Sequence, residues 1–384
     1  MSLGFDLGDE HVLLRDTVRQ FALEKVAPVA EELDREKRFP YDLVTEMAEL
    51  GLMGMTIPEE YGGGGTDTLA YAIAVEELTR IDSSVAITVA AHHSLGTLPI
   101  YYFGTEEQRR QWLPDLASGK KLAAFGLTEP NAGSDAAATR TTARLDDGEW
   151  VVDGAKMFIT NAGTDITACV TITALTGDAE ISNIIVPNGT QGYAISAPME
   201  KLGWRASDTR ELSFQGARVP EENLLGPRGE GFKQFLEILD GGRISVAAMG
   251  VGLAQGAFDL AYDYAKQREQ FGKPIAKFQS VQAKLVDMAT EIEAARQLVW
   301  KAAWEKDQGR DFRKSAAMAK LFSGELSHRA ARASCLAGQH ILGRTARACP
   351  THASRACPSV RRSRSPGRRS GRSGSRSRRR PCGR

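Results

Sequence analysis

The hydrophobic pattern of this chain changes its period twice, near residues 121 and 229. Residues 1–120 place apolar side chains at helical spacing, so that Leu14 and Val18 of the first such segment share one face. Residues 121–228 instead contain short runs separated by turn residues, which is typical of β-strands. The helical period then returns. The sequence therefore predicts an α+β fold of three consecutive parts, with an all-β domain between two helical bundles.

A hairpin is the strongest local signal in the middle part. Residues 141–163, TTARLDDGEWVVDGAKMFITNAG, read as two strands joined at Asp147-Gly148, a dipeptide that favours the tight turn of a β-hairpin. Further short strands follow with turn residues between them. We expect residues 121–228 to form a compact β-barrel or β-sandwich domain.

Residues 229–331 predict long helices. The first contains GVGLAQG, Gly250 to Gly256, whose place inside a helix favours close helix packing over dinucleotide binding. The second has apolar residues at alternating three- and four-residue steps from Phe278 to Val299. Such a sustained seam is typical of a helical bundle.

Charge divides the chain into two unlike pieces. Residues 1–325 contain 33 Lys and Arg against 48 Asp and Glu, a net charge of about −15, whereas sixteen arginines and no acid follow Glu325. The acidic body has no electrostatic reason to bind nucleic acid. Residues 332–384 are too charged and too poor in large apolar groups to fold, so we expect this tail to be disordered.

Targeting and metal-binding signals are not found in the sequence. The N-terminus has no basic region followed by an apolar run, and no apolar stretch of about 18 residues suggests a membrane span. Of the five cysteines only Cys169 precedes the tail region, and none shows a disulfide or metal-binding spacing. These features favour a reducing, cytoplasmic location and no metal site.

Several motifs in register resemble one enzyme family. The segment FGLTEPNAGSD, residues 125–135, resembles the signature of the acyl-CoA dehydrogenases, and PEEYGG, KMFITNAG, LDGGRISVAAMGVGLAQGA and REQFGKPIAKFQSVQAKLVDMA agree in order and spacing. The resemblance covers roughly residues 1–331 and is strongest to the short-chain, butyryl-type branch. It implies the helical, β, helical architecture already expected, the cofactor FAD and an acyl-CoA substrate.

The resemblance also places residues in the site. Around the isoalloxazine and ribityl chain of FAD it implies Phe125, Leu127, Thr128, Gly133 and Ser134, with Phe158, Ile159 and Thr160 over the other side. Arg268, Phe271 and Gln279 are implied to reach the FAD of a neighbouring subunit, which favours a homotetramer. For the substrate it implies Ser134, together with Asp240 and Arg243 toward the CoA moiety.

The residue that removes the substrate's α-proton is not found where the resemblance places it. In the short-chain branch the base is a Glu in an EGT motif near the C-terminus, after a GGxG segment, and the chain contains neither. Some relatives place the Glu in the long helix immediately before the Arg of L-D-x-x-R, and that position is Gly242. We therefore assign no catalytic residue and expect weak FAD retention and little dehydrogenation.

The tail has two possible origins. Its bias toward Arg, Ala, Gly, Pro, Ser and Cys is typical of GC-rich DNA read in a wrong frame, so we favour a frame disruption near Arg332 that replaced the last helices of the family. The alternative is a basic arm that binds RNA or an anionic membrane. Loss of those helices predicts that seam residues such as Met288 and Ile292 are partly exposed.

The expected function follows from the resemblance. It is the FAD-dependent α,β-dehydrogenation of a short or branched acyl-CoA to a trans-2-enoyl-CoA, with electrons passed to an electron-transferring flavoprotein. Within the family, the alternative is an oxidase or desaturase that uses oxygen. The alternative from another class is a non-catalytic flavoprotein remnant or a protein that binds through its Arg-rich tail.

Overall fold

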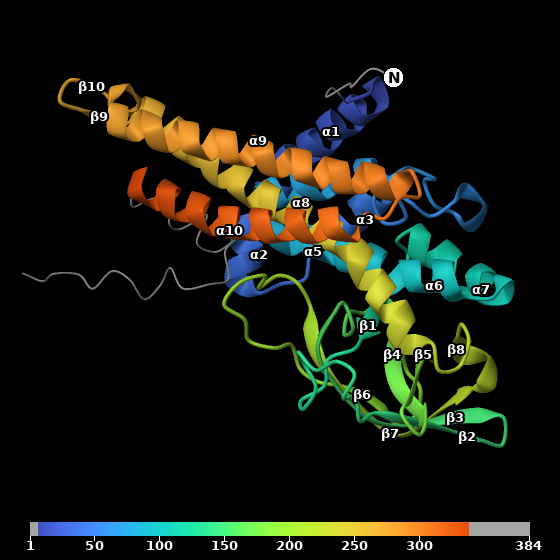
Figure 1. Cartoon of the computed structure of the whole chain (residues 1–384). Helices are drawn as coiled ribbons and strands as arrows, with labels where there is room; N and C mark the ends of the chain where they lie inside the picture. The colour runs from blue at the N-terminus through green and yellow to red at the C-terminus, as the bar shows by residue number, and fades with distance from the viewer. Residues whose placement is uncertain (1–6, 338–384) are drawn as a thin grey trace, which may run out of the picture. The chain divides into compact units, whose positions relative to one another are not determined.

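The computed structural model describes residues 7–337 of the chain (Figure 1). Residues 338–384, which form most of the segment predicted to be disordered, lie outside the described residues. Helices fill the first third of the chain, as the period predicted. Their bounds are α1 Asp9–Phe21, a π-helical turn Ala22–Val26, α2 Ala30–Glu36, α3 Tyr41–Glu49, α4 Thr68–Ile81, α5 Ser83–Ala91, a π-helical segment His92–Thr97, α6 Leu98–Phe103 and α7 Glu106–Ala117.

The central helix of this part, α4, is buried almost all round. Asp67 caps its N-terminus by accepting a hydrogen bond from the Ala70 N–H at 2.7 Å. Two of its buried residues are carboxylates, and each has a guanidinium partner on another helix. Arg19 of α1 bonds Glu77 at 2.6 Å, and Arg296 of α9 bonds Glu76 at 2.9 Å. The buried acids therefore connect α4 to both helical parts of the chain.

The middle part is one eight-stranded sheet. Its hydrogen-bonded order is β6-β7-β3-β2-β4-β5-β8, with β1 added in parallel to β4. The predicted hairpin is present as β2 and β3, and its turn residues Asp147 and Gly148 both have positive φ, as a type I′ turn requires. The strand bounds are β1 Leu122–Gly126, β2 Thr142–Asp146, β3 Glu149–Thr160, β4 Thr167–Gly177, β5 Glu180–Pro187, β6 Tyr193–Ile195, β7 Thr209–Pro220 and β8 Leu224–Leu225.

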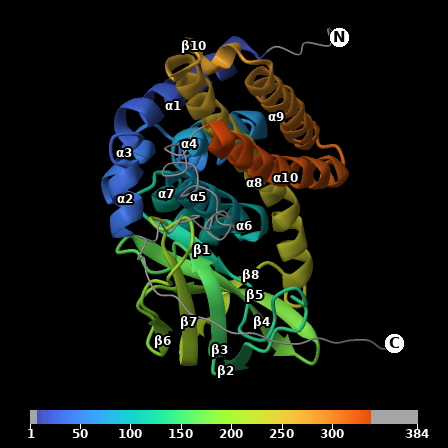
Figure 2. The same cartoon turned by 90° about the vertical axis from the view of Figure 1, so that its left-hand side faces the viewer.

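Both faces of the sheet are covered around β1. All five residues of β1 are buried, and alternate residues belong to different cores. Ala124 packs with the interior of the β-domain, next to Val170 and Ile172 of β4. Ala123 faces the other way and packs with side chains of the helical part, such as Leu113 of α7. Figures 1 and 2 both show the strands on one side of the helices, with β1 at the junction.

His92 fixes this junction. Its Nδ1 accepts a hydrogen bond from the Ala123 N–H of β1 at 3.1 Å, and its Nε2 donates to the Leu116 carbonyl of α7 at 2.9 Å. One buried ring therefore satisfies backbone groups of a strand and of a helix at once. The side chain lies in the π-helical segment, where the wider turn changes the direction in which side chains leave the helix.

Three long helices form the last part. They are α8 Gly231–Gln267, α9 Gln279–Asp307 and α10 Arg313–Ala337, and a short hairpin, β9 Glu269–Gln270 with β10 Lys273–Pro274, joins the first two. The glycines of the GVGLAQG segment pack α8 against its neighbours, as predicted. A Cβ at Gly252 would stand 2.4 Å from the Glu76 carbonyl of α4, and one at Gly250 would stand 2.8 Å from the Ser323 hydroxyl of α10.

Three expectations about this part need correction. Met288 and Ile292 are buried, with 5% and 2% of their surface exposed, because α9 packs against α4, α8 and α10. The last helix continues to Ala337, beyond the boundary placed at residue 331. Helix α8 also contains an 18-residue window apolar enough to span a membrane, but 61% of that window is buried inside the protein, as in a core helix.

We predict that Gly252→Ala destabilises the fold because α8 cannot approach α4 with a methyl group between them. Overpacking of this kind costs about 1–3 kcal/mol. The matched control is Gly324→Ala in α10, where a Cβ meets nothing within 4 Å. This control should gain up to about 1 kcal/mol from helix propensity. Urea unfolding measures both, and equal stabilities of the two variants would contradict the packing described.

We also predict that His92 makes the junction sensitive to acid. Burial lowers the pKa of His92 to about 4, and the bond to the Leu116 carbonyl opposes this shift only in part. A histidine in the unfolded chain has a pKa near 6.5, so below that pH the unfolded state binds a proton that the folded state does not. The free energy of unfolding therefore falls by roughly 3 kcal/mol between about pH 6.5 and 4.

His92→Gln provides the comparison because Gln keeps one donor and one acceptor and does not titrate. Urea unfolding at pH 7 and at pH 4.5 should show a smaller loss of stability in this variant than in the unaltered protein. The same loss in both proteins would show that His92 does not cause the acid sensitivity.

Candidate functional site

The loop that follows β1 lies directly against β3. The loop comprises residues 127–141, and the Met157 N–H of β3 donates a 2.7 Å hydrogen bond to the Thr128 carbonyl within it. Most of the predicted site residues lie either in this loop or between Phe158 and Thr160. The fold therefore brings together two segments that are separate in the sequence.

A buried ion pair holds the loop in place. The Lys156 Nζ lies 2.7 Å from Oε1 of Glu129, and it also donates to the Leu127 carbonyl at 3.2 Å and to the Thr173 hydroxyl at 3.1 Å. The Glu129 carboxylate in turn accepts from the hydroxyl of Thr139 and from the N–H groups of Arg140, at 2.7 Å, and Thr141, at 3.1 Å. One carboxylate and one ammonium thus join both ends of the loop to the sheet.

Hydrogen bonding keeps the pair charged. Burial alone would raise the pKa of Glu129, but the bonds from Lys156 and Thr139 outweigh it and lower the pKa to about 2. Burial lowers the pKa of Lys156 to about 8, although the Glu129 carboxylate opposes that shift. Both groups are therefore charged at neutral pH. Removal of one partner alone leaves an uncompensated buried charge, which typically costs about 3–5 kcal/mol.

Sequence reasoning missed this pair. Lys156 lies an even number of residues from Trp150 and Val152 of β3, so its side chain is on the same face of the strand. The Trp150 and Val152 side chains are both buried in the core. A lysine at an inward position of a strand requires a buried acid, and this signal was available in the sequence. Its partner Glu129 lies in a loop, so the contact itself could not be deduced from spacing.

Phe158 is held in an unusual backbone conformation beside the loop. The pairing of β3 with β7 shifts between Lys156 and Ile159, and Phe158 within this bulge has φ 64°. The Phe158 ring is 58% exposed, which is high for an aromatic side chain. Backbone strain of this kind persists where the surroundings fix it, and it is concentrated at functional sites.

The segment after β3 is clamped to the start of β7. Asp208 accepts from the Gly163 N–H at 2.8 Å and from Arg210 at 2.5 Å, and Arg210 donates to the Gly163 carbonyl at 3.1 Å. Asn161, which also has positive φ, donates through its amide to the Thr88 carbonyl at 2.9 Å. These contacts fix the backbone that directly follows β3, next to Phe158 and Thr160.

The loop has donors that no protein group uses. Within residues 7–337, several of its backbone N–H groups have no hydrogen-bond partner, and the hydroxyls of Thr128 and Ser134 have none either. Among these N–H groups are those of Leu127, Thr128, Gly133 and Ser134. A Cβ at Gly133 meets nothing within 4 Å, so the loop is open at that point. This donor set, with an exposed aromatic ring beside it, fits a planar, acceptor-rich group such as a flavin.

Two predicted cofactor residues lie in strands and are buried. Phe125 is 8% exposed and stacks on Phe235 of α8, with ring centroids 5.6 Å apart. Ile159 is 3% exposed and belongs to the core of the β-domain. These two side chains therefore support the site from behind.

The predicted substrate residues lie near the start of α8. Asp240 and Arg243 form an ion pair with each other, one helical turn apart, and both side chains are partly exposed. Gly242, between them in sequence, is buried, and a Cβ there meets nothing within 4 Å. The helix therefore has space for a larger side chain at this position.

The other predicted residues are far from the loop in the same chain. Arg268, Phe271 and Gln279 lie at the β9–β10 hairpin, at the opposite end of α8 from the β-domain (Figure 1). Phe271 has φ 53° and is 91% exposed, and its ring lies edge-on to the Phe278 ring, with centroids 6.0 Å apart. The structure thus does not bring these three residues to the loop within one chain.

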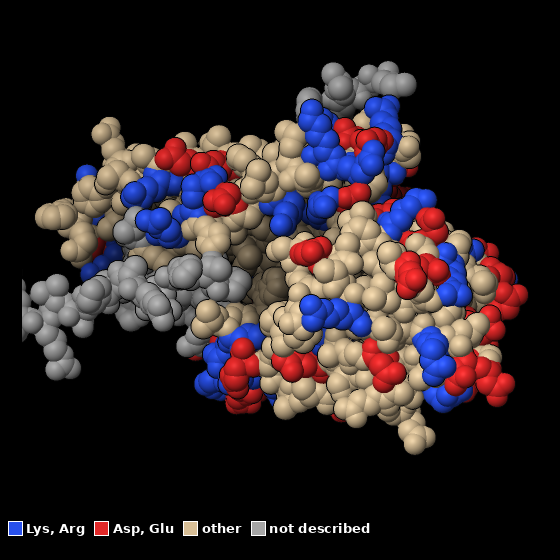
Figure 3. Space-filling model, turned by 60° about the horizontal axis from the view of Figure 1, so that its bottom comes forward, with Lys and Arg blue, Asp and Glu red and all other residues tan. Residues whose placement is uncertain are grey.

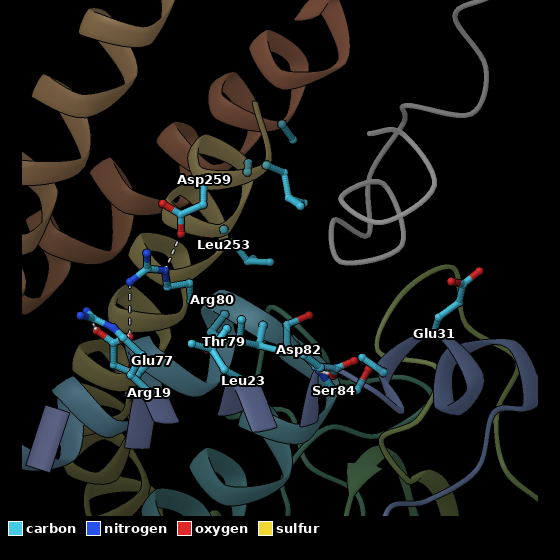
Figure 4. A pocket seen from close by; sticks show the side chains of 18 of the residues that line it. Arg19, Leu23, Glu31, Glu77, Thr79, Arg80, Asp82, Ser84, Leu253 and Asp259 are labelled. Atoms are coloured by element: carbon cyan, nitrogen blue, oxygen red, sulfur yellow. Dashed lines mark hydrogen bonds and ion pairs between the residues drawn. The ribbon is translucent and has the colours of Figure 1, made fainter. Parts of the chain in front are cut away.

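A cavity of about 640 Å³ lies elsewhere, between α1, α4, α5, α8 and α10 (Figure 4). None of the predicted site residues lines it. Arg80 extends along its wall and bonds Asp259 at 2.5 Å, and Arg19 and Glu77 pair beside it. Each of these charges already has a partner, so the cavity gives no sign of catalytic chemistry.

Surface charge and candidate metal ligands bear on other types of site. On the face shown in Figure 3, basic and acidic side chains are interspersed and form no continuous basic surface. Within the described part of the chain, no cluster of His, Cys, Asp and Glu could hold a metal ion.

Comparisons with known proteins cover all three parts of the chain. Three family profiles match: acyl-CoA dehydrogenase, N-terminal domain, over residues 8–120, middle domain over 124–217 and C-terminal domain over 229–346. An acyl-CoA dehydrogenase of Bacillus subtilis is 46% identical over 324 residues, which cover 84% of this chain and 86% of that protein.

Solved structures are similar as well. Butyryl-CoA dehydrogenase from Megasphaera elsdenii has a TM-score of 0.87 and 40% identity, covering 91% of this chain and 94% of that one. A structure described as the electron transferring flavoprotein of Acidaminococcus fermentans has a TM-score of 0.87 and 41% identity, covering 90% of this chain and 93% of that chain.

We predict that Phe158→Gly gives a more stable protein than Phe158→Ala, by about 1 kcal/mol, because only glycine adopts positive φ without strain. Leu145 of β2, also exposed but without positive φ, is the control. There the order should reverse, since glycine weakens an ordinary strand. Urea unfolding of the four variants measures both differences. A more stable Ala variant at residue 158 would contradict the strain.

Proposed function

Because the chain belongs to the acyl-CoA dehydrogenase family, whose members use FAD, we propose that it binds FAD at the loop of residues 127–141 and a short acyl-CoA thioester beside it. The single observation that supports this most is the meeting of the loop with Phe158, where donors and an exposed ring lie side by side. The similarity to butyryl-CoA dehydrogenase supports the short chain length.

In this proposal FAD supplies a hydride acceptor for the β-carbon of the substrate. The N–H groups of Thr128 and Ser134 would donate hydrogen bonds to bound flavin and so favour its reduction, and the Phe158 ring would pack beside it. Phe125, stacked on Phe235, keeps water from the inner side. Asp240 and Arg243 bind the CoA part, since a guanidinium pairs well with phosphate.

Removal of the α-proton requires a desolvated carboxylate, and this chain has none at either place where the family resemblance puts one. We therefore propose a flavoprotein that binds acyl-CoA and dehydrogenates it poorly.

Electron-transferring flavoprotein is the proposed partner that would accept electrons from the reduced flavin. The similarity to the structure from Acidaminococcus fermentans supports this partner. We also propose a homotetramer, in which a neighbour's FAD is reached by Arg268, Phe271 and Gln279. The proposed location is the cytoplasm.

The most direct test uses purified full-length protein under anaerobic conditions. Added FAD should bind weakly and turn the protein yellow, and butyryl-CoA should then shift the flavin spectrum with little bleaching. A colourless protein that takes up no added FAD but is retained by RNA would favour the tail-binding alternative. Fast bleaching would contradict the missing base.

We predict that Gly242→Glu restores dehydrogenation. Gly242 is buried, and a Cβ at this position would meet no atom within 4 Å, so a Glu side chain has room there. Burial would also desolvate its carboxylate, as a base that removes an α-proton requires. Loss of a general base typically costs 10²–10⁴-fold, so the anaerobic bleaching rate should rise by roughly that factor.

Gly242→Gln is the matched control, because Gln has the same shape and cannot accept the proton. It should bleach as slowly as the unaltered protein. Equal rates for the Glu and Gln variants would contradict the role given to this position.

A further inference from the structure

The charged groups beneath the loop decide which way one peptide unit points. Lys156 donates to the Leu127 carbonyl from inside the sheet, at 3.2 Å. The Leu127 C=O and the Thr128 N–H belong to the same planar trans peptide, so they point in opposite directions. With its carbonyl held inward by Lys156, this peptide must direct the Thr128 N–H outward.

Other contacts prevent the peptide from turning over. The next carbonyl, that of Thr128, accepts from the Met157 N–H at 2.7 Å. Gly126 makes room for the lysine. A Cβ at this position would lie 3.1 Å from Cγ of Lys156, which is closer than most such contacts. The lysine is fully buried and its carboxylate partner nearly so, which keeps water from replacing either group.

We propose that the Glu129–Lys156 pair is a positioning device for the flavin, which orients the Leu127–Thr128 peptide so that its N–H donates to the cofactor. This rests on the proposed FAD site. Glu129 and Lys156 do not themselves touch the flavin. They act through the peptide that lies between them and the open side of the loop.

The pair does more than neutralise two charges. Glu129 also takes up the N–H groups of Arg140 and Thr141, at the far end of the loop. These two N–H groups are thereby bonded to the protein, whereas the N–H groups of Leu127, Gly133 and Ser134 have no partner within the described residues and remain available to a ligand.

The experiment compares FAD binding by the full-length protein and two double variants. Glu129→Gln with Lys156→Met removes both charges together, so that no unpaired charge is left buried. Glu76→Gln with Arg296→Met does the same to the buried pair between α4 and α9, which has no contact with the loop. The readouts are the FAD dissociation constant, visible circular dichroism of bound flavin and the unfolding midpoint without FAD.

We expect the first double variant to bind FAD about 10- to 100-fold more weakly, the scale of losing one well-placed hydrogen bond to a charged acceptor. Its flavin dichroism should change, while the control pair keeps both values. A first double variant with unaltered affinity and dichroism would overturn the positioning role alone. If the unaltered protein binds no FAD, the proposed function fails and the positioning role falls with it.

Discussion

A single charged contact, between Glu129 and Lys156, decides the shape of the candidate site. Without it the loop between β1 and β2 would have to satisfy its inward-facing carbonyl and amide groups with water, which the fully buried lysine position does not admit. With it, the loop is tied to β3 at both ends and the bulge at Phe158 is held next to the loop. The orientation of the Leu127–Thr128 peptide follows from this contact, and the bonds of Asp208 and Asn161 fix the backbone after Phe158.

The contact in turn depends on how the domains meet. β1 contributes alternate residues to two cores, and His92 bonds it to α7 through buried hydrogen bonds. On the other side, glycines let α8 lie close to α4 and α10, which places the start of α8 and its Phe235 behind the loop. The buried pairs Glu76–Arg296 and Glu77–Arg19 hold α4 between the two helical parts. The site is therefore built on rigid elements, although its donors lie in a loop.

The sequence predicted the order of elements well, because period and turn chemistry are local properties. The hairpin at Asp147-Gly148 and the glycine packing of α8 were correct for that reason. The features that the sequence analysis got wrong or missed depend on contacts between residues that are distant in sequence. Met288 and Ile292 are covered by helices whose positions no local pattern gives. The Glu129–Lys156 pair and the positive φ of Phe158 are likewise visible only after the sheet has formed. The substrate and cofactor residues were placed by family resemblance, which says where they lie in sequence but not what holds them.

Hydrogen–deuterium exchange in the FAD-free protein tests the central claim most directly, because it reports on the loop without any ligand. If the ion pair fixes the loop, peptides that contain the hydrogen-bonded amides of Arg140, Thr141 and Met157 keep those amides protected from exchange in the unaltered protein. In the variant that combines Glu129→Gln with Lys156→Met, the same peptides should exchange much faster, while peptides from α4 and α9 remain unchanged. Equal exchange of the loop peptides in both proteins would show that other contacts hold the loop, and that the ion pair does not shape the site.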